Sequence, residues 1–306
     1  NESAIILLDF SENYSFVIQD EAQGFHWNTG SCTLHAAVVY YKKDERLYSK
    51  CLCLISDDMD HDVSLVYQTQ KIIINFLKTE LSLSHVKTVE YFSDGCAAQY
   101  KNYKNSINIC NYEADFGIKC KWSFFATSHG KSPCDGIGGT LKRMVTKASL
   151  QRPFNEQITT ASQVFNFCKD NLKEITVFFV TKEEMVQVQN DLTERFENAK
   201  TIPGTCCMHQ FVPLSTYQIG AKRLSSDMDY SVIFDIFKPV VNPNFKANSY
   251  VACVYDSLWY VGFIEKVNYE EGDATIKFMH PHGPSPSFYW PDNGTCDVPF
   301  SNIVPN

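Results

Sequence analysis

The chain lacks a long hydrophobic segment near its N-terminus, where the apolar run from Ala4 to Leu8 is only five residues long. A membrane-spanning helix needs about 20 apolar residues and the apolar part of a secretory signal about 7 to 15, so this run is too short for either. The sequence also begins with Asn1 rather than with methionine. We therefore expect a fragment or processed form of a soluble protein that is nuclear or cytoplasmic, is not secreted and does not bind membranes.

The sequence has twelve cysteines but no pair with the CxxC spacing that is typical of zinc ribbons. The cysteines are scattered, and a chain of 306 residues can bury a core without disulfide bonds. We therefore expect reduced thiols. The alternative is a Zn²⁺ site formed by His129, Cys134 and the Cys206–His209 cluster, which the spacing disfavours. A glycosylation sequon at Asn293 would matter only if the chain were secreted after all.

Positive charge is scarce in this chain, which has 27 Lys and Arg against 35 Asp and Glu and a net charge of −8. Evenly spread negative charge would disfavour nucleic acid, because phosphate binding needs a positive surface. The charge is uneven, however. Residues 1–62 hold eleven acidic and four basic residues, whereas residues 119–152 hold seven basic residues and one acidic residue, Asp135. We expect nucleic acid to lie along the basic segment.

Nucleotide-binding fingerprints and internal repeats are also absent from the sequence. The glycines at 136, 138 and 139 are followed by neither the Lys-Ser/Thr of a P-loop nor the acid spacing of a dinucleotide-binding unit. Nucleotide hydrolysis is therefore not supported. These glycines could instead let the backbone approach a phosphate at the start of a helix.

The chain does contain alternating apolar segments that are typical of a mixed α/β domain. The acidic stretch before Val63 suits the start of a helix, because negative charge there interacts favourably with the helix dipole. Strands are predicted at residues 4–9, 33–41, 47–55, 86–92 and 119–126, and helices at residues 63–81, 100–112 and 136–150.

Three acidic residues follow the ends of predicted strands. Asp9 lies at the tip of the first strand, Asp94 follows the fourth, and Asp135 lies among glycines after the fifth. Carboxylates gathered at strand ends predict a site for divalent metal ions. The alternative is that each aspartate caps a turn, because Asp before Gly is a common turn pair. Glu113 and Asp115 are alternatives to Asp135 as the third acid of this site.

This order of elements and acids resembles the RNase H-like superfamily, which includes DDE transposases and integrases. The segments DFSENY, YFSDGCAAQYKN and SHGKSPCDGIGGTLKR are similar to transposon-derived proteins of animal genomes. The resemblance covers residues 1–165. It implies a mixed sheet flanked by helices, with two Mg²⁺ or Mn²⁺ ions held by Asp9, Asp94 and Asp135. One departure is that the third acid of the family usually lies inside the last helix, whereas Asp135 is predicted to precede it.

The resemblance also implies an oligomer that binds DNA ends. A histidine in the position of His129 could position a phosphate, although a loop histidine bonded to the backbone is the alternative. The side chains expected to contact DNA are His129, Lys131, Lys142, Arg143 and Lys147.

The remainder of the chain divides into two predicted regions. Residues 166–240 are expected to form an α/β extension, with a connecting loop at 202–226. Residues 245–306 show short alternating strands separated by Pro and Gly, and they resemble small barrels of the SH3 or Tudor kind. Aromatic side chains at one rim would bind a peptide or chromatin ligand by cation–π attraction, with burial in the barrel core as the alternative. The residues in question are Tyr255, Trp259, Tyr260 and Phe278.

Two functions are consistent with these features. The first is a transposase- or integrase-like polynucleotidyl transferase, or a nuclease, that acts on DNA by a two-metal mechanism. The second is a catalytically inactive descendant that binds DNA, chromatin or protein. The three acids favour the first function, and the negative net charge favours the second.

Overall fold

The computed structural model describes residues 2–18, 30–125, 132–197, 199–236, 245–255, 258–269, 273–281, 288–291 and 294–304. The chain divides into two compact units, Asn1–Lys238 and Pro239–Asn306. Among the described residues, no helix is both long and apolar enough to cross a membrane.

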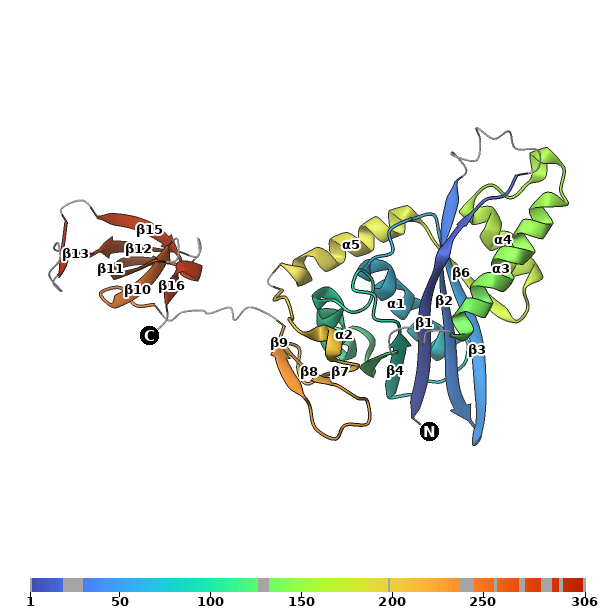
Figure 1. Ribbon diagram of the computed structural model, residues 1–306, viewed down its shortest axis with the longest axis horizontal. Helices are drawn as coiled ribbons and strands as arrows, with labels where there is room; N and C mark the ends of the chain where they lie inside the picture. Colours follow the sequence, from blue (N-terminus) through green and yellow to red (C-terminus); the bar gives the residue numbers. More distant parts are fainter. Residues whose placement is uncertain are drawn as a thin grey trace. The chain divides into compact units, whose positions relative to one another are not determined.

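The first unit is built on a large mixed sheet, in which the described strands follow the order β6-β3-β2-β1-β4-β5-β7-β8-β9 (Figure 1). The central strands β1, β4 and β5 run parallel, whereas β2 is antiparallel to both β1 and β3. The first strands and helices are β1 (Ser3–Ser15), β2 (Ser31–Lys43), β3 (Arg46–Ser56), α1 (Val63–Thr79), β4 (Thr88–Ser93), α2 (Tyr103–Phe116), β5 (Lys119–Phe124) and α3 (Pro133–Leu150). They are followed by α4 (Ala161–Asn171), β6 (Ile175–Val180), α5 (Lys182–Phe196), β7 (Gln210–Pro213), β8 (Gln218–Lys222) and β9 (Val232–Asp235).

Helices cover both faces of this sheet. Figure 1 shows α1 and α2 on one face and α3 and α4 on the other. Alternate residues of β1 supply the first core, in which Ile6 and Leu8 pack with residues of α1 and α2 such as Leu77 and Tyr112. The second core joins β2 and β3 to α3 and α4. Because successive side chains of a strand point to opposite faces, neighbouring residues of β1 face different cores.

The predicted strands and helices of residues 1–150 are all observed, but β1 continues to Ser15 instead of ending at residue 9, and α2 covers Tyr103–Phe116 instead of residues 100–112. Two further differences concern the edge of the sheet and α3. The loop predicted at 202–226 is wrong, because β7 and β8 lie within it and extend the sheet beyond β5. These strands have only four and five residues, too few to give a clear alternation. The other difference is the start of α3, at Pro133 instead of residue 136. Ser132 caps this helix and proline occupies its first turn, which is a favourable position for proline.

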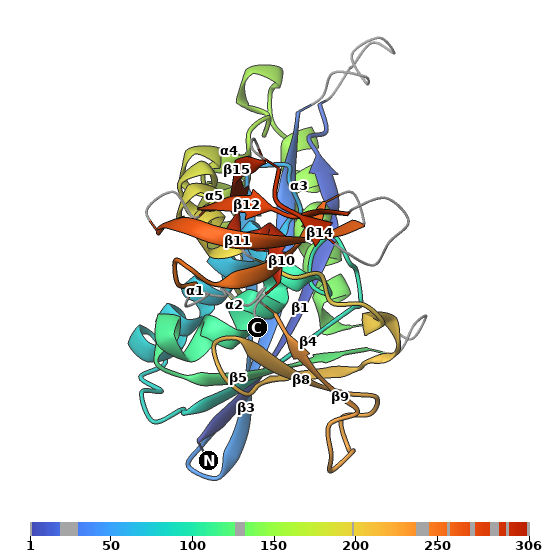
Figure 2. The same ribbon diagram turned by 90° about the vertical axis from the view of Figure 1, so that its left-hand side faces the viewer.

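The second unit contains a small antiparallel sheet with its own core. Its strands follow the order β15-β12-β11-β10-β16, and β10, β11 and β12 are seen side by side in Figure 2. Buried side chains such as Cys253, Ile264 and Ile276 form its core. The strands are β10 (Tyr250–Tyr255), β11 (Leu258–Asn268), β12 (Asp273–Phe278), β15 (Thr295–Pro299) and β16 (Ile303–Val304), with a separate pair β13 (His280–Pro281) and β14 (Phe288–Tyr289).

Candidate active site at the ends of the central strands

Asp9, Asp94 and Asp135 come from three neighbouring elements. Asp9 lies inside β1, which continues to Ser15, so the prediction that Asp9 ends this strand is wrong; Asp94 directly follows β4. The two strands are parallel with Leu7 opposite Phe92, so Asp9 and Asp94 lie two residues further along the same end of the sheet. Asp135 lies in the first turn of α3, inside the helix rather than before it. The prediction that Asp135 precedes the helix is therefore wrong.

The Asp9 carboxyl group lies close enough to those of Asp94 and Asp135 to be repelled by both. Burial, followed by repulsion from Asp94 and then from Asp135, raises the pKa of Asp9 from 3.8 to about 6. Asp94 and Asp135 each accept one local hydrogen bond from the backbone. The Cys96 amide donates to Asp94 Oδ1 over 3.1 Å, and the Ser132 amide donates to Asp135 Oδ2 over 3.2 Å. We refer to the three residues as the carboxylate cluster.

A glycine lets α3 approach β1 beside the carboxylate cluster. A Cβ atom added at Gly138 would lie 2.6 Å from Ser11 Oγ, whereas one added at Gly136 or Gly139 would meet nothing within 4 Å. Gly138 therefore serves the packing of α3 on β1. Its position brings the first turn of α3, with Asp135, toward Asp9.

The donor chemistry of the carboxylate cluster fits a divalent cation. Among the described residues, no three His, Cys, Asp or Glu side chains form a ready-made metal-binding group. Nevertheless, Mg²⁺ and Mn²⁺ prefer oxygen ligands, and a cation would offset the burial and the repulsion that together raise the pKa of Asp9. The residues that would hold it are the three aspartates.

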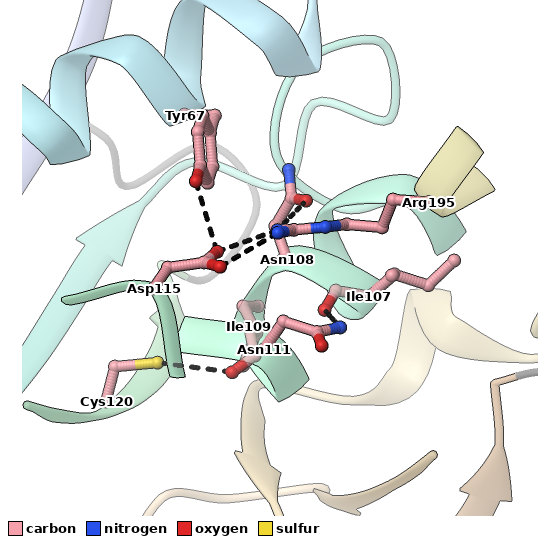
Figure 3. Close-up of polar contacts among 8 residues, drawn as sticks. All are labelled: Tyr67, Ile107, Asn108, Ile109, Asn111, Asp115, Cys120 and Arg195. Atoms are coloured by element: carbon pink, nitrogen blue, oxygen red, sulfur yellow. Dashed lines mark hydrogen bonds and ion pairs between the residues drawn. The ribbon is translucent and has the colours of Figure 1, made fainter. Parts of the chain in front are cut away.

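Glu113 and Asp115, the alternatives for the third acid, are used elsewhere. Asp115 accepts hydrogen bonds from both terminal nitrogens of Arg195, over 2.7 and 2.8 Å, and from the Tyr67 hydroxyl over 3.2 Å (Figure 3). Arg195 also donates to Asn108 Oδ1 over 3.3 Å. Asp115 therefore joins α1, α2 and α5. Glu113 lines a cavity of about 650 Å³ between α2, β5 and the β7–β8 turn.

Comparison with known proteins places the first unit in a family. Residues 1–225 match the profile of a family described as Domain of unknown function (DUF8701). The chain belongs to this family. Searches of curated proteins and of solved structures gave no match.

A buried polar network of the DUF8701 domain lies on the α1 side of β1, next to the carboxylate cluster. Phe10 stacks on His35 at 3.9 Å between ring centroids and on His61 at 4.6 Å. His35 contacts the Tyr100 hydroxyl and Thr69 Oγ1, each over 2.8 Å. Because Thr69 donates its proton to the Leu65 carbonyl, its oxygen accepts from His35 Nδ1, and the other ring nitrogen accepts from Tyr100.

Sequence reasoning missed this network. Burial lowers the pKa of His35 to about 3, so this histidine is neutral and structural at ordinary pH. A histidine inside the apolar segment TLHAAVVYY was the only available signal. Its partners lie far away in the sequence and carry no shared motif.

The predicted DNA-contacting residues of the DUF8701 domain are only partly described. His129 and Lys131 lie outside the described residues. Lys142 is half-buried, and Arg143 and Lys147 are exposed one turn apart on α3. Arg143 donates to Thr140 Oγ1 over 3.4 Å. Within the described ranges, none of these three forms an ion pair with an acid.

All twelve cysteines lie within the described residues and are free. The Cys134 thiol donates to the Leu7 carbonyl over 3.7 Å, and burial raises its pKa to about 12. Cys206 and Cys207 are exposed, and His209 contacts the Phe124 carbonyl over 3.3 Å. The zinc site suggested from the sequence also needs His129, which lies outside the described part.

In the second unit, two of the four predicted groove residues can be placed. Tyr260 and Phe278 meet edge to face, with their ring centroids 6.2 Å apart. Together with His280 and Thr295 they line a cavity of about 390 Å³. The side chains of Tyr255 and Trp259 lie outside the described part of the chain.

Proposed function

We propose that the DUF8701 domain is an RNase H-like polynucleotidyl transferase or nuclease core that acts on DNA with two divalent metal ions. The observation that carries the proposal is the convergence of Asp9 in β1, Asp94 after the parallel strand β4 and Asp135 in the first turn of α3, where burial and repulsion by the other two acids raise the pKa of Asp9. Concentrated negative charge of this kind is unfavourable unless a cation neutralises it. The order β3-β2-β1-β4-β5, with α3 beside β1, supports the RNase H-like assignment.

Each side chain then has a defined task. Asp9, Asp94 and Asp135 would hold Mg²⁺ or Mn²⁺. Bound ions would activate a water or a 3′-hydroxyl and stabilise the leaving oxygen of a phosphodiester. Lys142, Arg143 and Lys147 would contact phosphates along α3. Protonation of Asp9, with its pKa of about 6, would remove one ligand charge in mildly acidic solution.

The proposal is tested by Mn²⁺ binding and DNA cleavage. Asp9→Asn, Asp94→Asn and Asp135→Asn are each expected to weaken Mn²⁺ binding and to abolish cleavage or strand transfer on short duplexes. Asp115→Asn is the matched control, because it removes an acid that is paired with Arg195. Equal Mn²⁺ affinity of the wild-type protein and Asp9→Asn would refute the proposal.

A second candidate function is favoured by the aromatic cavity of the second unit. Tyr260 and Phe278 offer ring surface to a cationic side chain beside a cavity of about 390 Å³. On this alternative, the protein is an inactive descendant that binds chromatin or a peptide. Titration with methylated and unmethylated histone-like peptides tests it, with Tyr260→Ala expected to remove binding while the unit stays folded.

A further inference from the structure

Glu113 is an acid that neither the carboxylate cluster nor the contacts of Arg195 involve. It lies in the last turn of α2, where the helix dipole disfavours negative charge. Within the described residues it forms no ion pair. It lines the cavity of about 650 Å³ between α2, β5 and the β7–β8 turn, and ligand sites commonly have volumes of about 300 to 1,000 Å³. An unpaired acid in an unfavourable position beside a cavity indicates ligand binding rather than a role in folding.

The cavity opens where β7 separates from β5. The pairing of the two strands ends at Trp122 and Phe211, although β7 continues to Pro213. The same register would place Pro213 opposite Cys120. Proline has no amide proton to donate to a neighbouring strand, so the strands separate at a residue that cannot continue the pairing.

The separation exposes the backbone of Cys120 to the cavity. The Phe125 amide donates to the Ser93 carbonyl after 2.9 Å on the β4 side, and the Phe124 amide donates to the His209 carbonyl over 2.8 Å on the β7 side. Successive amides of β5 thus point to opposite edges, and that of Cys120 points the same way as that of Phe124. Among the described strands, none pairs with Cys120 on this edge. An unpaired edge of this kind can accept an extended peptide as an added strand.

On the α2 side, the cavity combines apolar walls with negative charge. The Cys120 thiol donates to the Ile109 carbonyl over 3.6 Å, so this side chain points toward α2 (Figure 3). Lys119 and Lys121 alternate with Cys120 and belong to the other face of the sheet, where Lys121 forms an ion pair over 2.7 Å. The charged side chain that lines the α2 side is therefore Glu113. The apolar side chains that line the cavity are Ile109, Ala114, Val212, Pro213 and Leu214.

We propose that this cavity binds an extended segment of a partner protein in which a lysine or arginine stands next to apolar residues. The backbone of the segment would pair with the free edge at Cys120, and its cationic side chain would pair with Glu113. Thr88 lines the cavity at the start of β4, whereas Asp94 follows the end of that strand. The site is therefore separate from the carboxylate cluster, and the inference does not rest on the proposed function.

The test uses the full chain in EDTA and two pentapeptides with blocked ends, Val-Lys-Val-Lys-Val and Val-Glu-Val-Glu-Val, in isothermal titration calorimetry. The lysine peptide is expected to bind more tightly, and Glu113→Gln should weaken its binding by about fivefold or more. Ala114→Leu fills part of the cavity and should remove binding while circular dichroism shows an unchanged fold. Methylation of one of the two alternating sets of peptide amides should also abolish binding, because only one edge of an extended segment faces β5.

Glu194→Gln is the matched control, since Glu194 is likewise an exposed acid in the last turn of a helix, α5, but does not line this cavity. It should leave binding unchanged. Equal losses with Glu113→Gln and Glu194→Gln would reduce the effect to general attraction by an acidic chain, and the inference would be wrong. It would also be wrong if the wild type did not bind the lysine peptide, or if neither set of methylated amides mattered. Asp9→Asn should bind this peptide as the wild type does, so failure of the proposed function would leave this result unchanged.

Discussion

The carboxyl group of Asp9 is partly buried and lies near those of Asp94 and Asp135, so the folded protein disfavours its ionised form. Asp9 therefore opposes folding at neutral pH unless a cation is present. A carboxylate inside a central strand that lowers stability is better explained by binding or catalysis than by packing.

The first prediction concerns the pH dependence of stability in EDTA. Folding raises the pKa of Asp9 from 3.8 to about 6, so between these values the folded state binds more protons than the unfolded state. The contribution of Asp9 to the free energy of unfolding therefore falls as pH rises from about 4 to 6. Asp9→Asn should be more stable than wild type at pH 7 and lose this advantage near pH 4. Urea unfolding at several pH values measures the difference, and a constant difference would contradict the prediction.

The second prediction is that replacing Asp115 lowers stability at neutral pH, whereas replacing Asp9 raises it. Its carboxylate and the Arg195 guanidinium have side-chain exposures of 15% and 23%, so removing one partner leaves the other charge largely shielded from water. We expect Asp115→Asn to lower the free energy of unfolding by about 2 kcal/mol at neutral pH while Mn²⁺ affinity is retained. Urea unfolding and Mn²⁺ titration check both parts, and weakened Mn²⁺ binding would place Asp115 in the metal site after all.

At the scale of elements, the close approach of α3 to β1 gives the third prediction. Gly138→Ala would place a methyl group against Ser11 and should destabilise the protein by about 1 to 3 kcal/mol. It should also weaken Mn²⁺ binding by moving Asp135 away from Asp9. Gly139→Ala, one residue later in the same helix, meets open space and should be neutral or stabilising by about 1 kcal/mol. Equal effects of the two substitutions would show that the packing at Gly138 is unimportant.

Much of the element order could be predicted because each long strand and helix carries its own periodic pattern. Asp9 and Asp94 were found because each follows an apolar run in the sequence, although β1 continues beyond Asp9 to Ser15. The start of α3 was misplaced, since the glycines around Asp135 suggested a loop and outweighed the capping signal of Ser132 and Pro133. The contacts of Cys134 with Leu7 and of Gly138 with Ser11 join residues more than 120 positions apart, and no local pattern encodes them.

At the scale of the whole molecule, the uneven charge gives the fourth prediction. Arg143 and Lys147 are exposed on α3, in the most basic part of an acidic chain. If they contact phosphates, replacing both by Glu should weaken DNA binding. The slope of the logarithm of the binding constant against the logarithm of salt concentration should become shallower by about two. Replacing Lys71 and Lys173, which are exposed elsewhere, makes the same change in net charge and should affect the slope less. An equal effect of both pairs would indicate unspecific attraction.

The division into two units gives the last prediction, which concerns unfolding. The unit Pro239–Asn306 has its own core, but a domain of this size buries little apolar surface and is marginally stable. The unit Asn1–Lys238 contains the large sheet with a core on each face. We therefore expect two transitions in urea, the smaller unit unfolding first. Trp122 lies in the first unit and Trp290 in the second, so Trp290→Phe should remove part of the early fluorescence change and leave the late one intact.

A chain truncated after Lys238 should show the late transition alone, at an unchanged midpoint. A shifted midpoint would mean that the units stabilise each other and that the sheet depends on the smaller unit.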